Sequence, residues 1–563
     1  MRVTDSRQIL AVWLIFAVSS LVGTPVPGVN EPHYLSKARS FIDSDWCRRD
    51  FFLTSVNAHY CFYSLTGPAA AVLQPGTVAV LGRLVSLLLL AWGWCRLGIA
   101  CGLTAAGQVM SAGLMLAIAG LGSFSGEWIV GGFESKVPAW GLALASVAFR
   151  IRADQGSSPR DALLAGLLAG LAAAFHPVVG LWFILATVVA GGADLSLRMV
   201  RRSGSAQAAT MPGSGGLNPA DKCRWRHGAA PRRGGEIWIY LTGCLVTSLP
   251  GLIPAAAMLR QSGITAEQNQ LANFVQVFWR LKHHLDPTEF RRAAWIHTLI
   301  LSLICSLCCG WLVRSKDQPR VMAGCRGIRQ LYSLLLVAAG IAAAGVWIGW
   351  HAVPAPKMTG WEWRAALLKF YPFRLFDGLL PIATAISGVL LVQSLRSPHL
   401  TPTLPTENRR NRKIQCVGFL ILTSVVAGTA LWNRPEAPGG YTPDQYDDWQ
   451  KACQWAREHT PADALFLTPR ESFGFKWFAE RAEFVNYKDC PQDAAGILQW
   501  NDRLWYVSGW MQRSSADGRY DREDLRTLHQ NTAVDYLVTR IPVVFTDEPL
   551  FAGRFWRIYR VPD

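Results

Sequence analysis

The sequence predicts a polytopic α-helical membrane protein that carries a small α/β domain at its C-terminal end. Of 563 residues, 51% are hydrophobic and only 17% are charged, whereas soluble domains carry about 25% charged residues. Apolar runs of about 20 residues, the length that crosses a bilayer core, recur along the chain. The segment 434–563 differs, because its apolar runs are short and its charges are frequent.

Eleven stretches are candidate membrane spans. The first resembles a signal peptide but lacks a small-residue cleavage site, so we expect it to remain as a helix. The stretch 161–192 could be one long helix or two short ones broken at His176-Pro177, because proline disfavours helix in the residue before it. The candidates are 9–24, 76–96, 103–123, 137–150, 161–175, 177–192, 237–258, 294–313, 331–351, 373–395 and 414–433.

Loop charge orients these spans. Loops 193–235, 314–330 and 396–413 hold 18 Lys and Arg in 78 positions, against 13 in the 121 positions of the intervening loops. Basic loops stay in the cytoplasm, which requires two spans in 161–192, an inner N-terminus and an outer C-terminus. The net charge of +16 is thus explained by membrane orientation, and we expect a lipid bilayer and no nucleic acid as partner. The predicted location is a bacterial cytoplasmic (inner) membrane.

Two domains follow. Residues 1–433 form the membrane domain with a first outer loop at 25–75, and residues 434–563 form an extracytoplasmic α/β domain. Segment 444–459 has helical spacing of apolar residues. Strands are expected in "ADALFLTP", "AEFVNY", "VDYLVTR" and "RFWRIYRV". The inner segments 201–235 and 397–413 are rich in Gly, Ser, Pro and Arg and are expected to be flexible.

Cysteines give few constraints. Cys47 with Cys61, and Cys453 with Cys490, lie in segments placed outside the cytoplasm. Each pair could form a disulfide there or stay as free thiols.

The first outer loop begins "GVNEPHYLSKARSFIDSDWCRRDFF" (28–52). Asn30 is a good N-cap and Pro32 suits a first helical turn. The following apolar spacing predicts an amphipathic helix in the plane of the interface, with Glu31 ionised near its N-terminus. Asn30-Glu31 could also be only a capping device.

Other outer loops carry further ionisable residues. "GEWIVGGFESKVPAW" contains Glu134, "VFWRLKHHLDP" contains Lys282, His283 and His284, and "KFYPFRLFD" contains Arg374. Ionisable residues at membrane depth are costly and mark functional sites. Two carboxylates and a ring of cations on one side fit a phosphate-bearing lipid donor and an acceptor that loses a proton.

An acidic residue after the first span, an amphipathic helix, a second acidic outer loop and an outer C-terminal domain resemble the GT-C superfamily of membrane glycosyltransferases. The resemblance implies a polyprenyl-phosphate-linked sugar as donor and inverting transfer to an acceptor that it does not name. Glu31 would be the base, and Glu134 would assist the acceptor or a divalent cation. His283, His284, Lys282 and Arg374 would hold the donor phosphate.

This chain has Asn30-Glu31 where the superfamily often has two acidic residues, which weakens the case for a metal; no metal-ligand set is predicted. His176 would form a wall of the donor groove, or would only mark a helix break.

The tail "ACQWAREHTPADALFLTPRESFGFKWFAERAEFVNYKDCPQDAAGILQW" resembles a C-terminal domain of unknown function found in uncharacterised bacterial polytopic membrane proteins. It implies no activity. The leading hypothesis is therefore a GT-C-like glycosyltransferase acting on the outer side of the membrane. The alternatives are a transporter or flippase for a lipid-linked or small polar substrate, and a non-catalytic membrane assembly protein.

Overall fold

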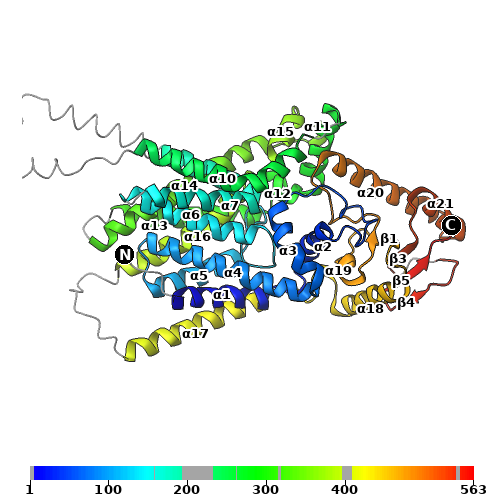
Figure 1. Cartoon of the computed structure of the whole chain (residues 1–563), viewed down its shortest axis with the longest axis horizontal. Helices are drawn as coiled ribbons and strands as arrows, with labels where there is room; N and C mark the ends of the chain where they lie inside the picture. Colours follow the sequence, from blue (N-terminus) through cyan, green and yellow to red (C-terminus); the bar gives the residue numbers. More distant parts are fainter. Residues whose placement is uncertain are drawn as a thin grey trace, which may run out of the picture.

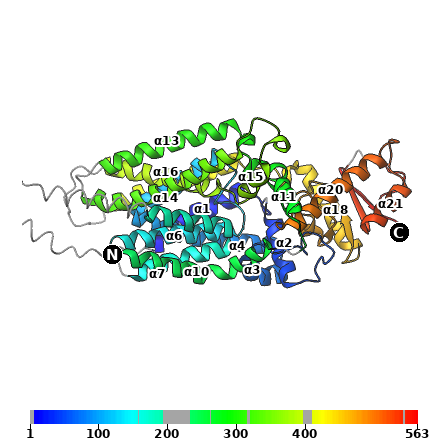
Figure 2. The same cartoon turned by 90° about the horizontal axis from the view of Figure 1, so that it is seen from above.

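The computed structural model describes residues 6–28, 30–156, 159–192, 233–260, 263–314, 319–395, 409–540 and 545–563. It is mostly helical, at 71%. The long helices run along one axis and form a bundle, and the C-terminal domain caps one end of that bundle (Figures 1 and 2). The two predicted flexible segments fall largely on 193–232 and 396–408, which lie outside the described residues.

Every predicted membrane stretch lies on a helix. Among the described residues, six helices are long and apolar enough to cross a membrane by length and composition: α1, α4, α10, α13, α14 and α16. The helices of this part are α1 (Ser6–Gly23), α2 (Glu31–Ile42), α3 (Tyr60–Val72), α4 (Pro75–Ala100), α5 (Ala105–Gly120), α6 (Lys136–Asp154), α7 (Pro159–Phe175), the helix Pro177–Gly192, α10 (Arg233–Met258), α11 (Ala266–Phe274), α12 (Lys282–Leu285), α13 (Arg292–Arg314), α14 (Pro319–Gly349), α15 (Trp361–Leu368), α16 (Arg374–Leu395) and α17 (Arg409–Trp432).

Small residues let these helices approach closely. A side chain at Gly93 of α4 would lie 2.1 Å from the carbonyl of Gly141 in α6. One at Gly166 of α7 would lie 2.1 Å from the carbonyl of Tyr240 in α10. Such contacts are typical of membrane helices, where small residues replace a hydrophobic driving force.

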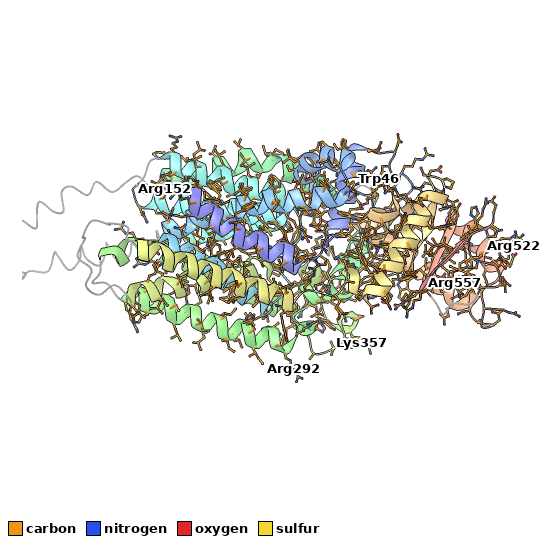
Figure 3. All side chains as sticks on the ribbon, turned by 90° about the horizontal axis from the view of Figure 1, so that it is seen from below. Trp46, Arg152, Arg292, Lys357, Arg522 and Arg557 are labelled. Carbon is orange, nitrogen blue, oxygen red and sulfur yellow. The ribbon has the colours of Figure 1, made fainter. Side chains whose placement is uncertain are left out.

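The helix ends divide between the two ends of the bundle. α10 and α17 both begin at the end away from the C-terminal domain (Figure 1). Arg152 lies at that same end, whereas Arg292 and Lys357 lie near the C-terminal domain (Figure 3). Part of the predicted loop 314–330 is helical instead, since α14 begins at Pro319.

Helix α2 forms where predicted, but it is not an interfacial helix with a free polar face. Lys37, expected on that face, is buried. Its ammonium group donates to the carbonyls of Phe52, Leu53 and Ser55 at 2.7, 2.9 and 2.6 Å. The loop after α2 therefore folds back over the polar side of the helix, and its carbonyl groups accept hydrogen bonds from the Lys37 ammonium group.

The C-terminal part contains the predicted sheet. The strands are β1 (Leu465–Leu467), β2 (Ala482–Glu483), β3 (Tyr536–Arg540), β4 (Phe551–Ala552) and β5 (Trp556–Arg560), in the order β2-β1-β3-β5-β4. β1 is parallel to β2 and β3, and β5 is antiparallel to β3 and β4. The helices are α18 (Pro443–His459), α19 (Phe475–Ala479), α20 (Ala494–Ser514) and α21 (Arg522–Thr532). The four predicted strand segments are confirmed, and the short β4 was missed.

The four cysteines considered for disulfides are free thiols. Cys47 and Cys453 are buried, and Cys61 and Cys490 are partly buried. The disulfide alternative left open by the sequence is therefore not adopted in this structure.

Candidate functional site

Glu31 is fully buried and its carboxylate is saturated. Arg83 of α4 donates from Nε to Oε1 at 2.6 Å and from Nη2 to Oε2 at 2.7 Å. The backbone N–H groups of Phe133 and Gly28 donate to Oε1 and Oε2 at 2.7 and 2.5 Å. Four donors occupy the four lone-pair directions of the carboxylate, so no oxygen is left to accept a proton from a substrate. This arrangement does not favour the predicted catalytic role of Glu31.

The same pair joins three segments. Arg83 also donates to the carbonyls of Thr24 and Pro25 at 2.7 and 2.8 Å. Arg83 and Glu31 therefore fix the turn after α1 against α4 and against the loop that follows α5. A bidentate, fully hydrogen-bonded pair of this kind offsets the cost of burying two charges. Asn30 makes no side-chain cap, so the capping interpretation of Asn30-Glu31 is not what the structure shows either.

Glu134, the second predicted acidic residue, is also buried. Asn30 donates its amide N–H to Glu134 Oε1, and the ammonium group of Lys136 lies 3.7 Å from Oε2. Burial raises the pKa of Glu134, while Lys136 and Asn30 oppose that shift. Lys136 also lies 3.8 Å from Glu127 and 3.7 Å from the ring centre of Trp128. Two buried acids thus share one lysine in this loop.

Helix α16 holds this loop in place. Asp377 accepts the backbone N–H groups of Phe124, Ser125 and Glu127 at 2.6, 2.9 and 3.0 Å. Three backbone donors within four residues fix the loop against the helix. The carboxylate of Glu127 is thereby directed toward the first residue of α16, Arg374, whose Nε lies 3.1 Å from Oε2.

A cavity of about 660 Å³ lies beside this loop, between the bundle and the C-terminal domain. Four Lys and Arg side chains lie on its wall. The only carboxylate among its lining residues is Asp493. The cationic and histidine side chains on the wall are Arg280, Lys369, Arg374, Lys488, His33, His59, His176, His283 and His284. An excess of positive charge at a partly buried site attracts an anion.

Arg374 and His176, predicted separately, are in contact. Nη1 of Arg374 lies 3.3 Å from Nε2 of His176, and the guanidinium lies 4.1 Å from the ring centre of Tyr371. His176 occupies the break between α7 and the helix Pro177–Gly192. The helix break therefore places a histidine on the cavity wall, beside the arginine.

His283 and His284 also line the cavity. Nδ1 of His284 hydrogen-bonds the carbonyl of Ser125, and burial lowers the pKa of His284 to about 3. Gly126 has φ +80°, and a side chain there would lie 2.5 Å from the His284 ring. Glycine at this position lets the loop meet the histidine, which is a neutral hydrogen-bonding group at neutral pH.

Lys282 does not belong to this group. Its side chain is about half exposed, and its ammonium group lies 3.2 Å from Glu289 on the surface. It is absent from the cavity wall. Of the residues predicted to bind phosphate, the structure therefore brings His283, His284 and Arg374 together and leaves Lys282 outside.

An apolar groove of about 840 Å³ adjoins the cavity. Its walls come from the helix Pro177–Gly192, α10, α14 and α15, with residues such as Leu181, Trp182 and Ile348. The groove and the cavity share lining residues, among them His59 and Phe370. A groove that is apolar between long apolar helices and opens to a cationic cavity beside the C-terminal domain suits a lipid with an anionic head.

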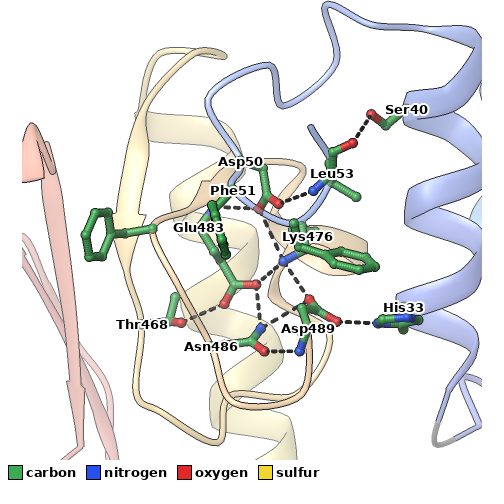
Figure 4. A network of polar contacts seen from close by, with 12 residues as sticks. His33, Ser40, Asp50, Phe51, Leu53, Thr468, Lys476, Glu483, Asn486 and Asp489 are labelled. Carbon is green, nitrogen blue, oxygen red and sulfur yellow. Dashed lines mark hydrogen bonds and ion pairs between the residues drawn. The ribbon is translucent and has the colours of Figure 1, made fainter. Parts of the chain in front are cut away.

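A second buried charge cluster joins α2 and the loop after it to the C-terminal domain (Figure 4). Lys476 lies at its centre, with Nζ at 3.2 Å from Asp50, 2.6 Å from Glu483 and 2.7 Å from Asp489. The other oxygen of Asp489 lies 2.8 Å from Nδ1 of His33 in α2. Three carboxylates and one lysine leave this cluster with an excess of negative charge.

The acids of this cluster differ in how they are satisfied. Glu483 accepts further hydrogen bonds from Thr468, Ser472 and Asn486. Burial raises the pKa of Asp50, against the opposing effect of Lys476. Burial would also raise the pKa of Asp489, but Lys476 and the bond to His33 outweigh it and hold that pKa well below its ordinary value. Asp489 is therefore ionised and accepts the Nδ1 proton of His33.

Within the described ranges, no group of three or more His, Cys, Asp or Glu side chains is arranged to hold a metal ion. Adjacent His283 and His284 instead lie with ring centres 4.1 Å apart on the cavity wall.

Several site residues were not identified from sequence. Arg83 had a signal, because an arginine inside an apolar run needs a partner. His33, Glu127 and Asp489 had none, because Glu127 pairs with Arg374, 247 positions away, and His33 pairs with Asp489, 456 positions away.

Comparison with known proteins identifies only the tail. Residues 447–507 match a family described as a Domain of unknown function (DUF6798). No curated protein matches the chain. The matched segment runs from α18 into α20 and contains Lys476, Glu483 and Asp489. The GT-C resemblance has no support from a family match, and the chain is similar to DUF6798 over this segment alone.

Proposed function

We propose that the protein is a GT-C-like glycosyltransferase that moves a sugar from a polyprenyl-phosphate carrier to an acceptor on the outer side of the cytoplasmic membrane. The observation that carries the proposal is the continuity between the apolar groove and the cationic cavity. A polyprenyl chain would occupy the groove between the membrane helices. Its phosphate would then lie among Arg280, Lys488 and Arg374.

The charge of the cavity supports a phosphate leaving group. Transfer of the sugar adds negative charge to the phosphate oxygen as the bond to the anomeric carbon breaks. Fixed cations in a partly buried site stabilise such charge without reorganisation. Arg280 is well placed, since its Nη2 donates to the Lys488 carbonyl at 3.1 Å and its guanidinium lies 4.6 Å from the Tyr487 ring centre.

The expected membrane orientation accompanies this proposal. With eleven spans, the basic loops would face the cytoplasm, and the cavity and C-terminal domain would face outward. The common end at which α10 and α17 begin, away from the C-terminal domain, agrees with that orientation. A sugar carried on a polyprenyl phosphate would reach the cavity from the membrane, through the groove.

The test is transfer from a panel of radiolabelled polyprenyl-phosphate sugars by purified protein in lipid nanodiscs. Binding of unlabelled polyprenyl phosphate is measured in parallel. Ala256 lines the groove and its neighbour Ala257 does not. We expect Ala256→Trp to block the groove and reduce both binding and transfer at least tenfold, while Ala257→Trp leaves both within twofold.

Three outcomes would contradict the proposal in different ways. Binding of polyprenyl phosphate without transfer of any sugar would favour the flippase alternative. Neither binding nor transfer would favour an assembly role. Equal effects of the two tryptophan substitutions would show that the groove is not the lipid site.

A further inference from the structure

A histidine on the wall of the cationic cavity is oriented by an aspartate from the C-terminal domain. Nδ1 of His33 lies 2.8 Å from Oδ1 of Asp489. The ring also packs on Phe52, with centres 4.3 Å apart. Nε2 of His33 makes no hydrogen bond within the described part of the chain. An ionised carboxylate on Nδ1 fixes the proton there and leaves Nε2 as an unprotonated acceptor.

His33 also lies on the wall of a second cavity, of about 450 Å³. This cavity is enclosed by the turn between α1 and α2 and by the C-terminal domain. Among their lining residues, the two cavities share only His33 and Lys488. His33 and Lys488 therefore lie where the cationic cavity and the second cavity adjoin.

The second cavity has the chemistry of a saccharide site. The aromatic residues Phe473, Trp477 and Tyr487 line it together with the charged residues Glu471 and Lys488. Sugars present hydroxyls at their edges and C–H groups on their faces, so they use both kinds of wall. The volume lies within the range of about 300 to 1,000 Å³ usual for small-molecule sites.

Resting on the proposed function, we propose that this second cavity binds a saccharide acceptor and that His33, positioned by Asp489, is the general base of the transfer. An acceptor hydroxyl oxygen attacks the anomeric carbon of the donor and its proton passes to Nε2 of His33. The bond from that carbon to the phosphate oxygen breaks, and its electron pair stays on the phosphate among the cations. The imidazolium formed is stabilised by Asp489, as in other histidine–carboxylate pairs.

The two glutamates suit this role less well. Glu31 has no free oxygen, and neither Glu31 nor Glu134 lies on the wall of either cavity. His33 touches both. The C-terminal domain would thus complete the active site, because its Asp489 orients a base carried by the membrane domain.

The charges around His33 agree with a base that is neutral at pH 7. Burial lowers the pKa of His33, and Asp489 opposes that shift. Lys476 and Lys488 lower it further, and His59 and the Tyr34 hydroxyl are the other titratable groups beside it. A histidine with a pKa below 6.5 accepts a proton over the whole physiological range.

The test uses full-length protein in nanodiscs with a donor that gives transfer in the wild type. His33→Asn can still donate to Asp489 but has no basic nitrogen. We expect kcat to fall about 10²- to 10⁴-fold, the usual contribution of a general base, with donor Kd within twofold. Imidazole should restore activity to His33→Ala. His459→Asn, at an exposed histidine of α18, is the control and should change nothing.

Asp489 is tested as a positioning residue through the pH profile. Asp489→Asn removes the charge that raises the pKa of His33, so the acid limb of kcat should move to lower pH and kcat should fall. Asp50→Asn removes a carboxylate from the same lysine without touching His33. It should leave the acid limb in place. Equal effects of the two substitutions on the pH profile would overturn the positioning role.

Failure of this inference can be separated from failure of the proposed function. Wild-type transfer with His33→Asn activity within fivefold would overturn His33 as base and leave the glycosyltransferase standing. If no donor supports transfer, acylation of His33 by diethyl pyrocarbonate replaces kcat as the readout. Slowing of that acylation at least fivefold by a panel of hexose and pentose mono- and disaccharides would support the saccharide site, and an unchanged rate would overturn it.

Discussion

Two buried charge clusters meet at the start of α2, one on Glu31 and one on His33, and they differ in what they leave unpaired. In the first, Arg83 and two backbone N–H groups use every acceptor direction of the Glu31 carboxylate. In the second, Lys476 binds three carboxylates, and one of these holds His33 by a single nitrogen. The first cluster is closed, and the second ends in a free basic atom on a cavity wall.

This difference shows why an acidic residue after a membrane helix is a weak indicator of chemistry. A buried carboxylate that is fully paired with an arginine holds segments of the chain together. A catalytic base instead needs an atom with a free lone pair that faces a cavity. The clusters also differ in which parts of the chain they connect. Glu31 connects parts of the membrane domain, whereas His33 connects the membrane domain to the C-terminal domain.

The largest effect is expected at the centre of the second cluster. Lys476→Met leaves Asp50, Glu483 and Asp489 without their cation, and breaking a buried pair costs about 3 to 5 kcal/mol, with this triple case near the upper end. The substitution should lower Tm and expose the C-terminal domain to protease. Unfolding in detergent, followed by tryptophan fluorescence, measures this. Lys451→Met, at an exposed lysine of α18, is the matched control. An unchanged Tm for Lys476→Met would mean that the cluster does not hold the domains together.

A somewhat smaller loss is expected in the first cluster. Glu31→Gln leaves the buried Arg83 without a carboxylate. It also places the glutamine NH₂ group against N–H groups that now donate to Glu31, so the free energy of unfolding should fall by about 3 kcal/mol. Transfer should then fall only in proportion to the folded fraction. Glu289→Gln, at an exposed ion pair, should change Tm little, since such pairs are worth about 0 to 1 kcal/mol. A Glu31→Gln protein with normal Tm and no transfer would restore Glu31 as the base.

The sequence predicted the helices and most strands because their signals are local. Apolar length marks the membrane helices, and alternation with turn residues marks β1, β3 and β5. The helix α2 followed from the spacing of its apolar residues, from Tyr34 to Ile42. Its environment did not follow, because Lys37 is buried by a loop whose path no local pattern encodes.

The site was predicted only in part for the same physical reason. His283, His284 and Arg374 were selected because the sequence predicts them to be ionisable residues at the membrane interface, and the structure brings all three to one cavity wall. Lys282 shares that signal, yet it points to Glu289 on the surface, since neighbours on one helical turn face different directions. The pairing of His33 with Asp489 spans 456 positions and depends on how the C-terminal domain docks.

A moderate loss of folding stability is expected when the pH is lowered. Burial lowers the pKa of His59 and of His284 to about 3, below the unfolded value of 6.5. Below pH 6.5 the unfolded chain binds protons that the folded protein does not, so stability falls as pH falls. At pH 5 each histidine should cost about 2 kcal/mol relative to pH 7.5.

Tm measured at both pH values checks this. His59→Gln should reduce the loss on acidification, and His459→Gln should not. Equal pH dependence in all three proteins would show that these histidines are not buried in the neutral form.

The smallest effect is expected on lipid binding, when the unpaired Lys488 is compared with the paired Lys282. Lys488 lies on both cavity walls, and its ammonium group makes no hydrogen bond or ion pair within the described residues. Lys282 is paired with Glu289. Lys488→Gln should therefore weaken binding of polyprenyl phosphate about tenfold, or about 1.4 kcal/mol, and Lys282→Gln should leave Kd within twofold. The reverse order would place the phosphate at the surface near Lys282, away from the place where the two cavities adjoin at His33. His33 could then not act as the general base, because its free nitrogen would lie far from the bound sugar donor.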